Sequence, residues 1–197
     1  MKIYIVLTKT NTLLSKMISI IKNDEYTHAS ISLDKNLNNL YSFGRKNCYN
    51  PFVGRFVKEN LNEGVFGWHE CLNGLVMELN VTKQQYESAE KLLNEFILSS
   101  KIYKYNYAGL INSLFNRKSY QNDRFLCSEF VYYVLNKSKI ADLNKPRNLV
   151  RPQDLLKLDC NIIFEGNLKN TKWSKRIKTG GDGSCWTIFD KIASKTI

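Results

Sequence analysis

The sequence lacks the features of a fibrous, disordered or membrane-spanning chain. It has three prolines and ten glycines among 197 residues, too few for a collagen-like or linker-dominated protein. No apolar run approaches the roughly 20 residues that a helix needs to cross a bilayer. The apolar residues 3–7 give way to polar residues 8–11 before a signal-peptide core could form. We therefore expect a soluble, cytoplasmic protein.

Histidines are also scarce, and the cysteines are not closely spaced in pairs. The chain has two histidines, which leaves few candidate general bases, and its five cysteines are Cys48, Cys71, Cys127, Cys160 and Cys185, with no C-x-x-C pair. An odd number of widely spaced cysteines without a secretion signal favours free thiols over a disulfide framework, and it gives little support to a zinc site. We expect neither a metal nor another cofactor.

The composition and charge indicate a globular domain with a basic surface. Hydrophobic residues make up 43% of the chain, and 29 Lys and Arg against 18 Asp and Glu give a net charge of +11. Such a surface attracts polyanions without selectivity. The lysines are scattered except in residues 169–178, so we predict no specific nucleic-acid partner. An anionic substrate or a membrane surface bound through this tail stays open, and the sequence does not indicate an oligomeric state.

Short apolar runs and amphipathic stretches alternate along residues 1–168. The patterns predict strands at residues 3–7, 28–33, 40–43, 75–79 and 161–164, helices at residues 12–21, 82–97, 107–115, 126–136 and 154–157, and irregular structure over residues 44–73. They show no βαβ alternation. We therefore predict an α+β domain, a small antiparallel sheet packed against helices, with a basic, glycine-interrupted extension at residues 169–197.

Cys127 stands where a nucleophile is favoured. It opens the predicted helix LCSEFVYYVL, where unpaired backbone N–H groups and the helix dipole stabilise a thiolate. Val131 and Leu135 follow at i+4 and i+8, so the thiol lies at the start of a buried stripe that faces the sheet. A cysteine on such a stripe also fits a purely structural role in the core.

His28 and Ser42 are the candidate partners of this thiol. His28 begins a predicted strand in which Ser30 and Ser32 share its face, and these small side chains would let a helix pack close to the imidazole. Ser42, on the returning strand of the predicted hairpin, is placed to bond the far ring nitrogen and fix its tautomer. The expected catalytic group is Cys127 as nucleophile, His28 as base and Ser42 as orienting residue.

Two segments around these residues resemble a known family. Residues 26–33 (YTHASISL) are similar to the histidine strand, and residues 125–131 (FLCSEFV) to the Cys-Ser-Glu-Phe-Val helix start, of the permuted branch of the papain-like NlpC/p60 superfamily. This branch is the YiiX/YycO-like group, whose wider relatives include lecithin retinol acyltransferase. In it the histidine precedes the cysteine, as it does here. Residues 41–45 (YSFGR) and 151–155 (RPQDL) also resemble this group, and the resemblance covers residues 1–168.

The resemblance implies a permuted papain-like fold and a cysteine amidase or peptidase that works through an acyl-enzyme. It implies peptide or amide-containing substrates, among them cell-wall-type peptides. Glu129 matches the motif of this group, and we expect its negative charge to stabilise the first helical turn electrostatically. Relatives more often carry His, Asn, Gln or Glu at the third polar position, so Ser42 departs from the pattern. Two alternatives remain: a thiol acyltransferase or lipase that acts on lipid acyl groups, and a non-catalytic basic binding module.

Other motifs compete with this assignment. Cys185 lies in Gly-Ser-Cys-Trp, a fragment that resembles the nucleophile segment of unpermuted papain-like proteases, but no histidine follows it. His69 and Cys71 lie two residues apart without the further ligands that a metal site needs. Aromatic side chains between Ser42 and Leu75 fit either a lid over the site or packing in the core: Phe43, Tyr49, Phe52, Phe56, Phe66 and Trp68.

Overall fold

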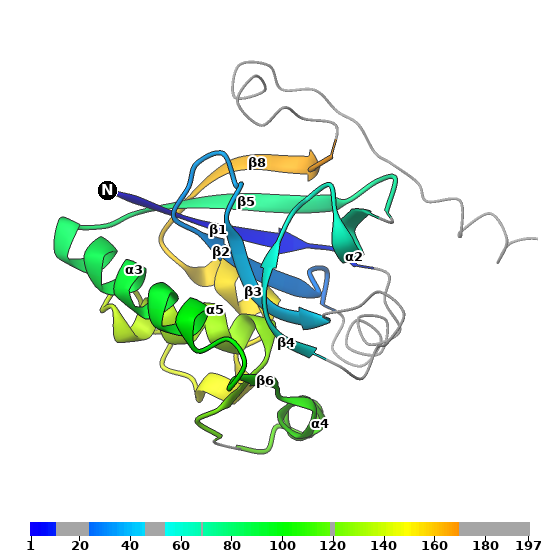
Figure 1. Cartoon of the computed structure of the whole chain (residues 1–197), viewed down its shortest axis with the longest axis vertical. Helices are drawn as coiled ribbons and strands as arrows, with labels where there is room; N and C mark the ends of the chain where they lie inside the picture. The colour runs from blue at the N-terminus through cyan, green and yellow to red at the C-terminus, as the bar shows by residue number, and fades with distance from the viewer. Residues whose placement is uncertain (11–23, 46–53, 68, 119–120, 170–197) are drawn as a thin grey trace, which may run out of the picture.

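A computed structural model describes residues 1–10, 24–45, 54–67, 69–118 and 121–169. These residues form one sheet with helices packed against it (Figure 1). The helix predicted at residues 12–21, the tail from residue 170 and the candidate Cys185 lie outside the described residues. No helix within the described part of the chain is long and apolar enough to cross a membrane.

The sheet has eight strands in the order β7-β6-β4-β3-β2-β1-β5-β8. All neighbouring pairs are antiparallel except β6 and β7. The strands are β1 (Lys2–Thr8), β2 (His28–Ser32), β3 (Leu40–Arg45), β4 (Gly54–Glu59), β5 (Asn73–Asn80), β6 (Lys104–Tyr105), β7 (Arg124–Phe125) and β8 (Asn161–Asn167). The predicted α+β class and antiparallel pairing are confirmed, and the sheet is larger than the small one expected.

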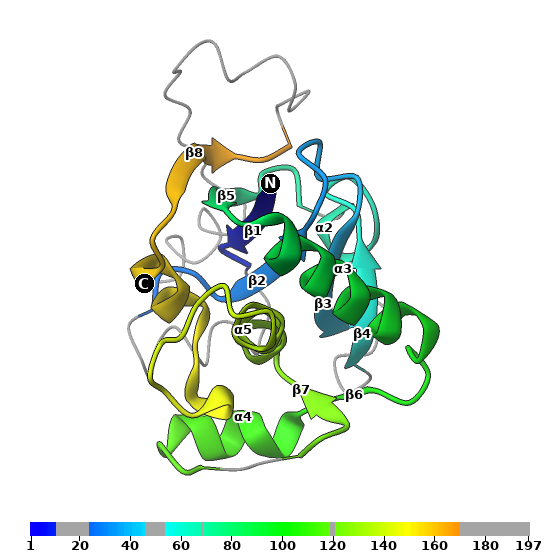
Figure 2. The same ribbon diagram turned by 90° about the vertical axis from the view of Figure 1, so that its left-hand side faces the viewer.

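The helices connect these strands and cover the sheet. They are α2 (Gly64–Gly67), α3 (Lys83–Leu98), α4 (Tyr107–Leu114), α5 (Cys127–Lys137), and the short 3₁₀ helices η1 (Arg147–Leu149) and η2 (Pro152–Lys157). The predicted start of α3 is confirmed, because Thr82 caps the helix and Gln85 completes a capping box. Figure 2 shows α3 and α5 next to each other against the sheet, with α4 farther out.

Two features differ from the sequence-based expectation. Residues 54–59, expected to be irregular, form β4, which pairs with β3 along its whole length. The parallel strands β6 and β7 are joined by α4, so a short β-α-β unit does occur at one edge of the sheet. Both departures involve strands that are short or rich in charged residues, and such strands give little hydrophobic periodicity.

Alternate side chains of the sheet enter two hydrophobic clusters. The larger cluster lies between the sheet and the helices and includes Ala29, Ile31 and the buried residues of α5. Its centre is a group of aromatic rings with centroids 4.9 to 6.1 Å apart: Phe43, Phe56, Phe96, Phe125 and Phe130. The second cluster covers the opposite face and includes Val6, Leu40 and Phe66. The aromatic residues Phe43, Phe56 and Phe66 are therefore core residues.

Phe130 tests this packing because it is fully buried among Phe43, Phe56 and Phe96. We expect Phe130→Ala to lower the free energy of unfolding by about 3–5 kcal/mol, since it removes an aromatic side chain and leaves a cavity. Urea denaturation followed by circular dichroism measures the change. Phe115→Ala is the matched control, because Phe115 is 70% exposed and its loss should change stability by less than about 0.5 kcal/mol.

Candidate functional site

Cys127 is a buried free thiol in the first turn of α5. The His28 side chain and the backbone N–H groups of Ala29 and Ser128 lie beside its sulfur and lower the pKa of the thiol. All three contacts favour a sulfur that carries negative charge, as does the N-terminal end of the helix. The structure thus brings together Cys127 and His28, which lie 99 positions apart in the sequence.

His28 is held from two sides. Its Nε2 lies 2.9 Å from Oε1 and 3.2 Å from Oε2 of Glu59 at the end of β4. Because Nε2 faces this carboxylate, Nδ1 is the ring nitrogen that remains for the Cys127 thiol. The Phe66 ring also packs against the imidazole in a T-shaped arrangement, with centroids 5.8 Å apart. These contacts fix both the orientation of the ring and the role of each nitrogen.

The charges of the site support an ion pair. Burial lowers the pKa of His28, but the negative charges of Glu59 and Cys127 outweigh this effect and raise that pKa well above 6.5. Burial raises the pKa of Cys127, but the positive charge of His28 outweighs this effect and brings that pKa below the usual value of a thiol. Both shifts favour a thiolate and an imidazolium, and the thiolate is the reactive form of a cysteine.

Glu59 is the residue that sequence reasoning missed, and Ser42 does not occupy the predicted place. The Ser42 hydroxyl donates to the carbonyl oxygen of Ala29 at 2.7 Å and is fully buried, while the carboxylate of Glu59 binds the far nitrogen of His28. Ser42 therefore supports the strand beside His28 and does not orient its ring. The available signal was the alternation along residues 54–59, which puts Arg55, Val57 and Glu59 on one face of a strand. The glycine and the charged residues in this segment make that strand pattern hard to recognise.

The packing of α5 also differs from the expectation. We predicted that a helix would approach His28 across the small side chains of Ser30 and Ser32. Instead α5 packs on the other face of β2, against Ala29 and Ile31, and Ser30 donates a hydrogen bond to Glu59. The thiol reaches His28 because Cys127 stands at the very start of the helix, beside the first residue of β2.

The first turn of α5 is anchored by the buried carboxylate of Glu129. Its Oε2 accepts from the backbone N–H of Leu126 at 3.1 Å and from Asn106 Nδ2 at 3.4 Å, and its Oε1 accepts from Arg147 Nε at 2.8 Å. Burial raises the pKa of Glu129, against the opposing effects of the Leu126 N–H and Arg147. The expected role of Glu129 in the first turn agrees with these contacts. Arg147 also lies over the Phe125 ring, 4.7 Å from its centroid.

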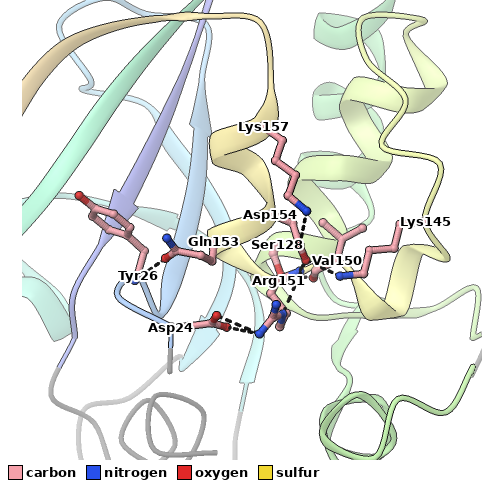
Figure 3. Close-up of polar contacts among 9 residues, drawn as sticks. All are labelled: Asp24, Tyr26, Ser128, Lys145, Val150, Arg151, Gln153, Asp154 and Lys157. Atoms are coloured by element: carbon pink, nitrogen blue, oxygen red, sulfur yellow. Dashed lines mark hydrogen bonds and ion pairs between the residues drawn. The ribbon is translucent and has the colours of Figure 1, made fainter. Parts of the chain in front are cut away.

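Residues 150–154 connect α5 to the segment that leads into His28 (Figure 3). Arg151 Nη1 donates to both carboxylate oxygens of Asp24, at 2.9 and 3.1 Å, and Gln153 Oε1 accepts from the backbone N–H of Tyr26 at 3.2 Å. On the other side, Ser128 Oγ donates to the carbonyl oxygen of Val150 at 2.6 Å. One short segment thus fixes the residues before His28 and the start of the helix that carries Cys127 relative to each other.

This segment is itself held by Asp154. Its Oδ2 accepts from the backbone N–H of Arg151 at 2.9 Å and from Lys145 Nζ at 2.6 Å, and Lys157 lies 3.6 Å from its other oxygen. Burial raises the pKa of Asp154, but the bonds from Lys145 and Arg151 bring it below the usual value. The carboxylate is therefore charged at neutral pH and stabilises the turn that presents Arg151 and Gln153 (Figure 3).

The other candidates do not join this site. Among the residues that the structure describes, no group of three or more His, Cys, Asp or Glu side chains could hold a metal ion. Cys71 is disulfide-bonded, so the expectation of free thiols is wrong for this residue. Cys160 is free and partly exposed, and burial raises its pKa.

Comparison of the chain with known protein families, with curated protein sequences and with solved structures finds no match.

The two free thiols of the described residues, Cys127 and Cys160, give an internal test of the ion pair. We expect iodoacetamide at pH 6–7 to modify Cys127 before Cys160, although Cys127 is the more buried, because the pKa of Cys127 is lowered and that of Cys160 is raised. Mass spectrometry of the digested protein measures both rates across pH. His28→Ala should remove the preference, and equal modification of the two thiols in the unaltered protein would contradict the ion pair.

The anchor of α5 is tested by removing one partner of its buried ion pair. We expect Arg147→Met to lower the free energy of unfolding by about 3–5 kcal/mol, because Glu129 is fully buried and would keep an unpaired charge. Urea denaturation measures the loss. The double variant Arg147→Met/Glu129→Gln should recover part of it, since the glutamine carries no charge and still accepts from Leu126. A double variant no more stable than the single one would count against this explanation.

Proposed function

We propose that the chain is a cysteine-dependent hydrolase that cleaves amide-linked substrates through an acyl-enzyme. The observation that carries the proposal is the contact of a buried thiol at a helix start with an imidazole whose far nitrogen binds a carboxylate. In this assignment Cys127 is the nucleophile, His28 the general base and acid, and Glu59 the orienting residue. The three have the nucleophile–base–orienter order that covalent catalysis requires.

The chemistry follows from this arrangement. The Cys127 thiolate attacks the carbonyl carbon of the substrate, and the carbonyl oxygen becomes an oxyanion. The backbone N–H of Cys127, at the start of α5, supplies one donor for that oxyanion. Protonated His28 then gives its proton to the leaving amine, the C–N bond breaks, and a thioester forms. Neutral His28 next takes a proton from water, which attacks the thioester and frees both the acid product and the thiol.

The sequence resemblance supports the same assignment. The histidine strand precedes the cysteine helix, as in the permuted papain-like group, and a glutamate is among the residues found at the third position in that group. The α+β architecture with an antiparallel sheet is compatible with a permuted papain-like fold over residues 1–168. Peptides, including cell-wall-type peptides, are the substrates that the resemblance suggests, and a cytoplasmic location stays a prediction.

Capture of the acyl-enzyme tests the proposal. We expect a panel of small peptides and activated amide substrates to acylate the unaltered protein, seen as a mass increase on the Cys127 peptide, and Cys127→Ala to show none. His28→Ala should reduce the rate of acylation by about 10²–10⁴-fold, the usual contribution of general base catalysis. Glu59→Gln keeps the size of the side chain but removes its charge, so its rate of acylation should lie between that of the unaltered protein and that of His28→Ala.

Two other outcomes would contradict this proposal, and each would indicate a different function. Transfer of fatty acyl groups from phospholipid vesicles to Cys127, without turnover of peptides, would make the protein a thiol acyltransferase. Salt-sensitive binding to anionic vesicles or nucleic acid that survives Cys127→Ala, with no acylation by any substrate, would make it a basic binding module.

A further inference from the structure

Ser30 makes an unusually placed hydrogen bond beside the site. Its Oγ donates to Oε2 of Glu59 at 2.5 Å, and the serine is 1% exposed. The other carboxylate oxygen, Oε1, is the one nearer to His28 Nε2, at 2.9 Å. The carboxylate is thus held at both oxygens, one by the imidazole and one by a buried hydroxyl from the same strand as that imidazole.

Gly44 also lies next to the carboxylate of Glu59. A Cβ on Gly44 would make van der Waals contact with Glu59 Oε1 at 3.4 Å and with His28 Cε1 at 3.8 Å, so Gly44 lies directly beside both groups. Glu59 reaches this place from the last position of β4 through a flexible side chain with several rotatable bonds. The Ser30 hydroxyl adds a second contact to that of His28, and the two together favour one rotamer of this side chain.

From these contacts we propose that Ser30 is a positioning residue, which acts on His28 through Glu59 by holding the carboxylate against the imidazole. This inference rests on the proposed function, because it assigns a role within the same catalytic group. It differs from the role first predicted for Ser42: both serines are buried and lie on adjacent strands, but Ser42 binds a backbone carbonyl and Ser30 binds the orienting carboxylate.

The consequence concerns the charge of the thiol. Glu59 and Cys127 are the charged groups whose interactions raise the pKa of His28. When the Ser30 hydroxyl is absent, the Glu59 carboxylate can turn away, the imidazolium loses part of its stabilisation, and the thiolate loses part of its counter-charge. The midpoint of thiol ionisation then moves to higher pH, and less thiolate is present near neutrality.

The test is the pH profile of Cys127 alkylation by iodoacetamide in Ser30→Ala. We expect its rate at pH 6 to fall about tenfold, as for the loss of one hydrogen bond to a charged group, and its midpoint to move up. Ser42→Ala, which removes an equally buried hydroxyl, should keep the profile of the unaltered protein. Ser30→Thr keeps a hydroxyl and should keep the profile of the unaltered protein. Ser30→Val, in which the side chain has the shape of threonine without the hydroxyl, should not. This pair of variants decides the case if Ser30→Ala does not fold.

A second measurement separates this inference from the proposed function. The chain has two histidines, so the ring resonances of His28 can be assigned by comparison with His69→Ala and titrated by NMR in the Cys127→Ala background. Ser30→Ala should lower the pKa of His28 there, and Ser42→Ala should not. An unchanged His28 titration in Ser30→Ala overturns the positioning role. Failure of Cys127 to react before Cys160 in the unaltered protein overturns the proposed function, while the NMR comparison still decides the role of Ser30.

Discussion

The contact between a buried thiol and a buried imidazole is costly unless other groups stabilise its charged form. Taking a thiolate and an imidazolium out of water carries a penalty of several kcal/mol for each ion, and their mutual attraction offsets this only with good geometry and further hydrogen bonds. Here Glu59 supplies the counter-charge to His28, and the backbone N–H groups of Ala29 and Ser128 favour negative charge on the sulfur. Much of the described structure serves to hold these donors in place.

Positions far apart in the sequence share this task. The carboxylate of Glu129 fixes the first turn of α5 through Leu126 and Arg147, and the segment from Val150 to Asp154 links that helix to the residues before β2. Both anchors use charged side chains that are largely buried but fully paired. Such pairs add little net stability compared with apolar packing, but each one fixes a geometry, because a displaced partner would leave a buried charge alone.

The parts of this site that could be predicted are those with strong local patterns. The buried stripe of α5 and its start near Cys127 follow from helical periodicity, and a helix start has the unpaired N–H groups that stabilise a thiolate. The alternation of residues around His28 places that residue on a strand. Glu59 could not be found in this way, because β4 is short and bounded by glycine and charged residues, and because the reach of a long side chain is not encoded in periodicity. Ser42 was assigned wrongly because a serine in a strand has nearby backbone carbonyls as competing partners, and Ala29 provides one.

The bond between Arg151 and Asp24 joins residues 127 positions apart. It has a consequence for the order of events when the chain is made. Contacts of such long separation form late, since much loop entropy must be lost before they are gained. His28 and Cys127 both leave the ribosome before Arg151 does, so they emerge before the segment that fixes them relative to each other. The thiol of Cys127 is therefore fixed beside His28 only after residues 150–154 have emerged and folded against both.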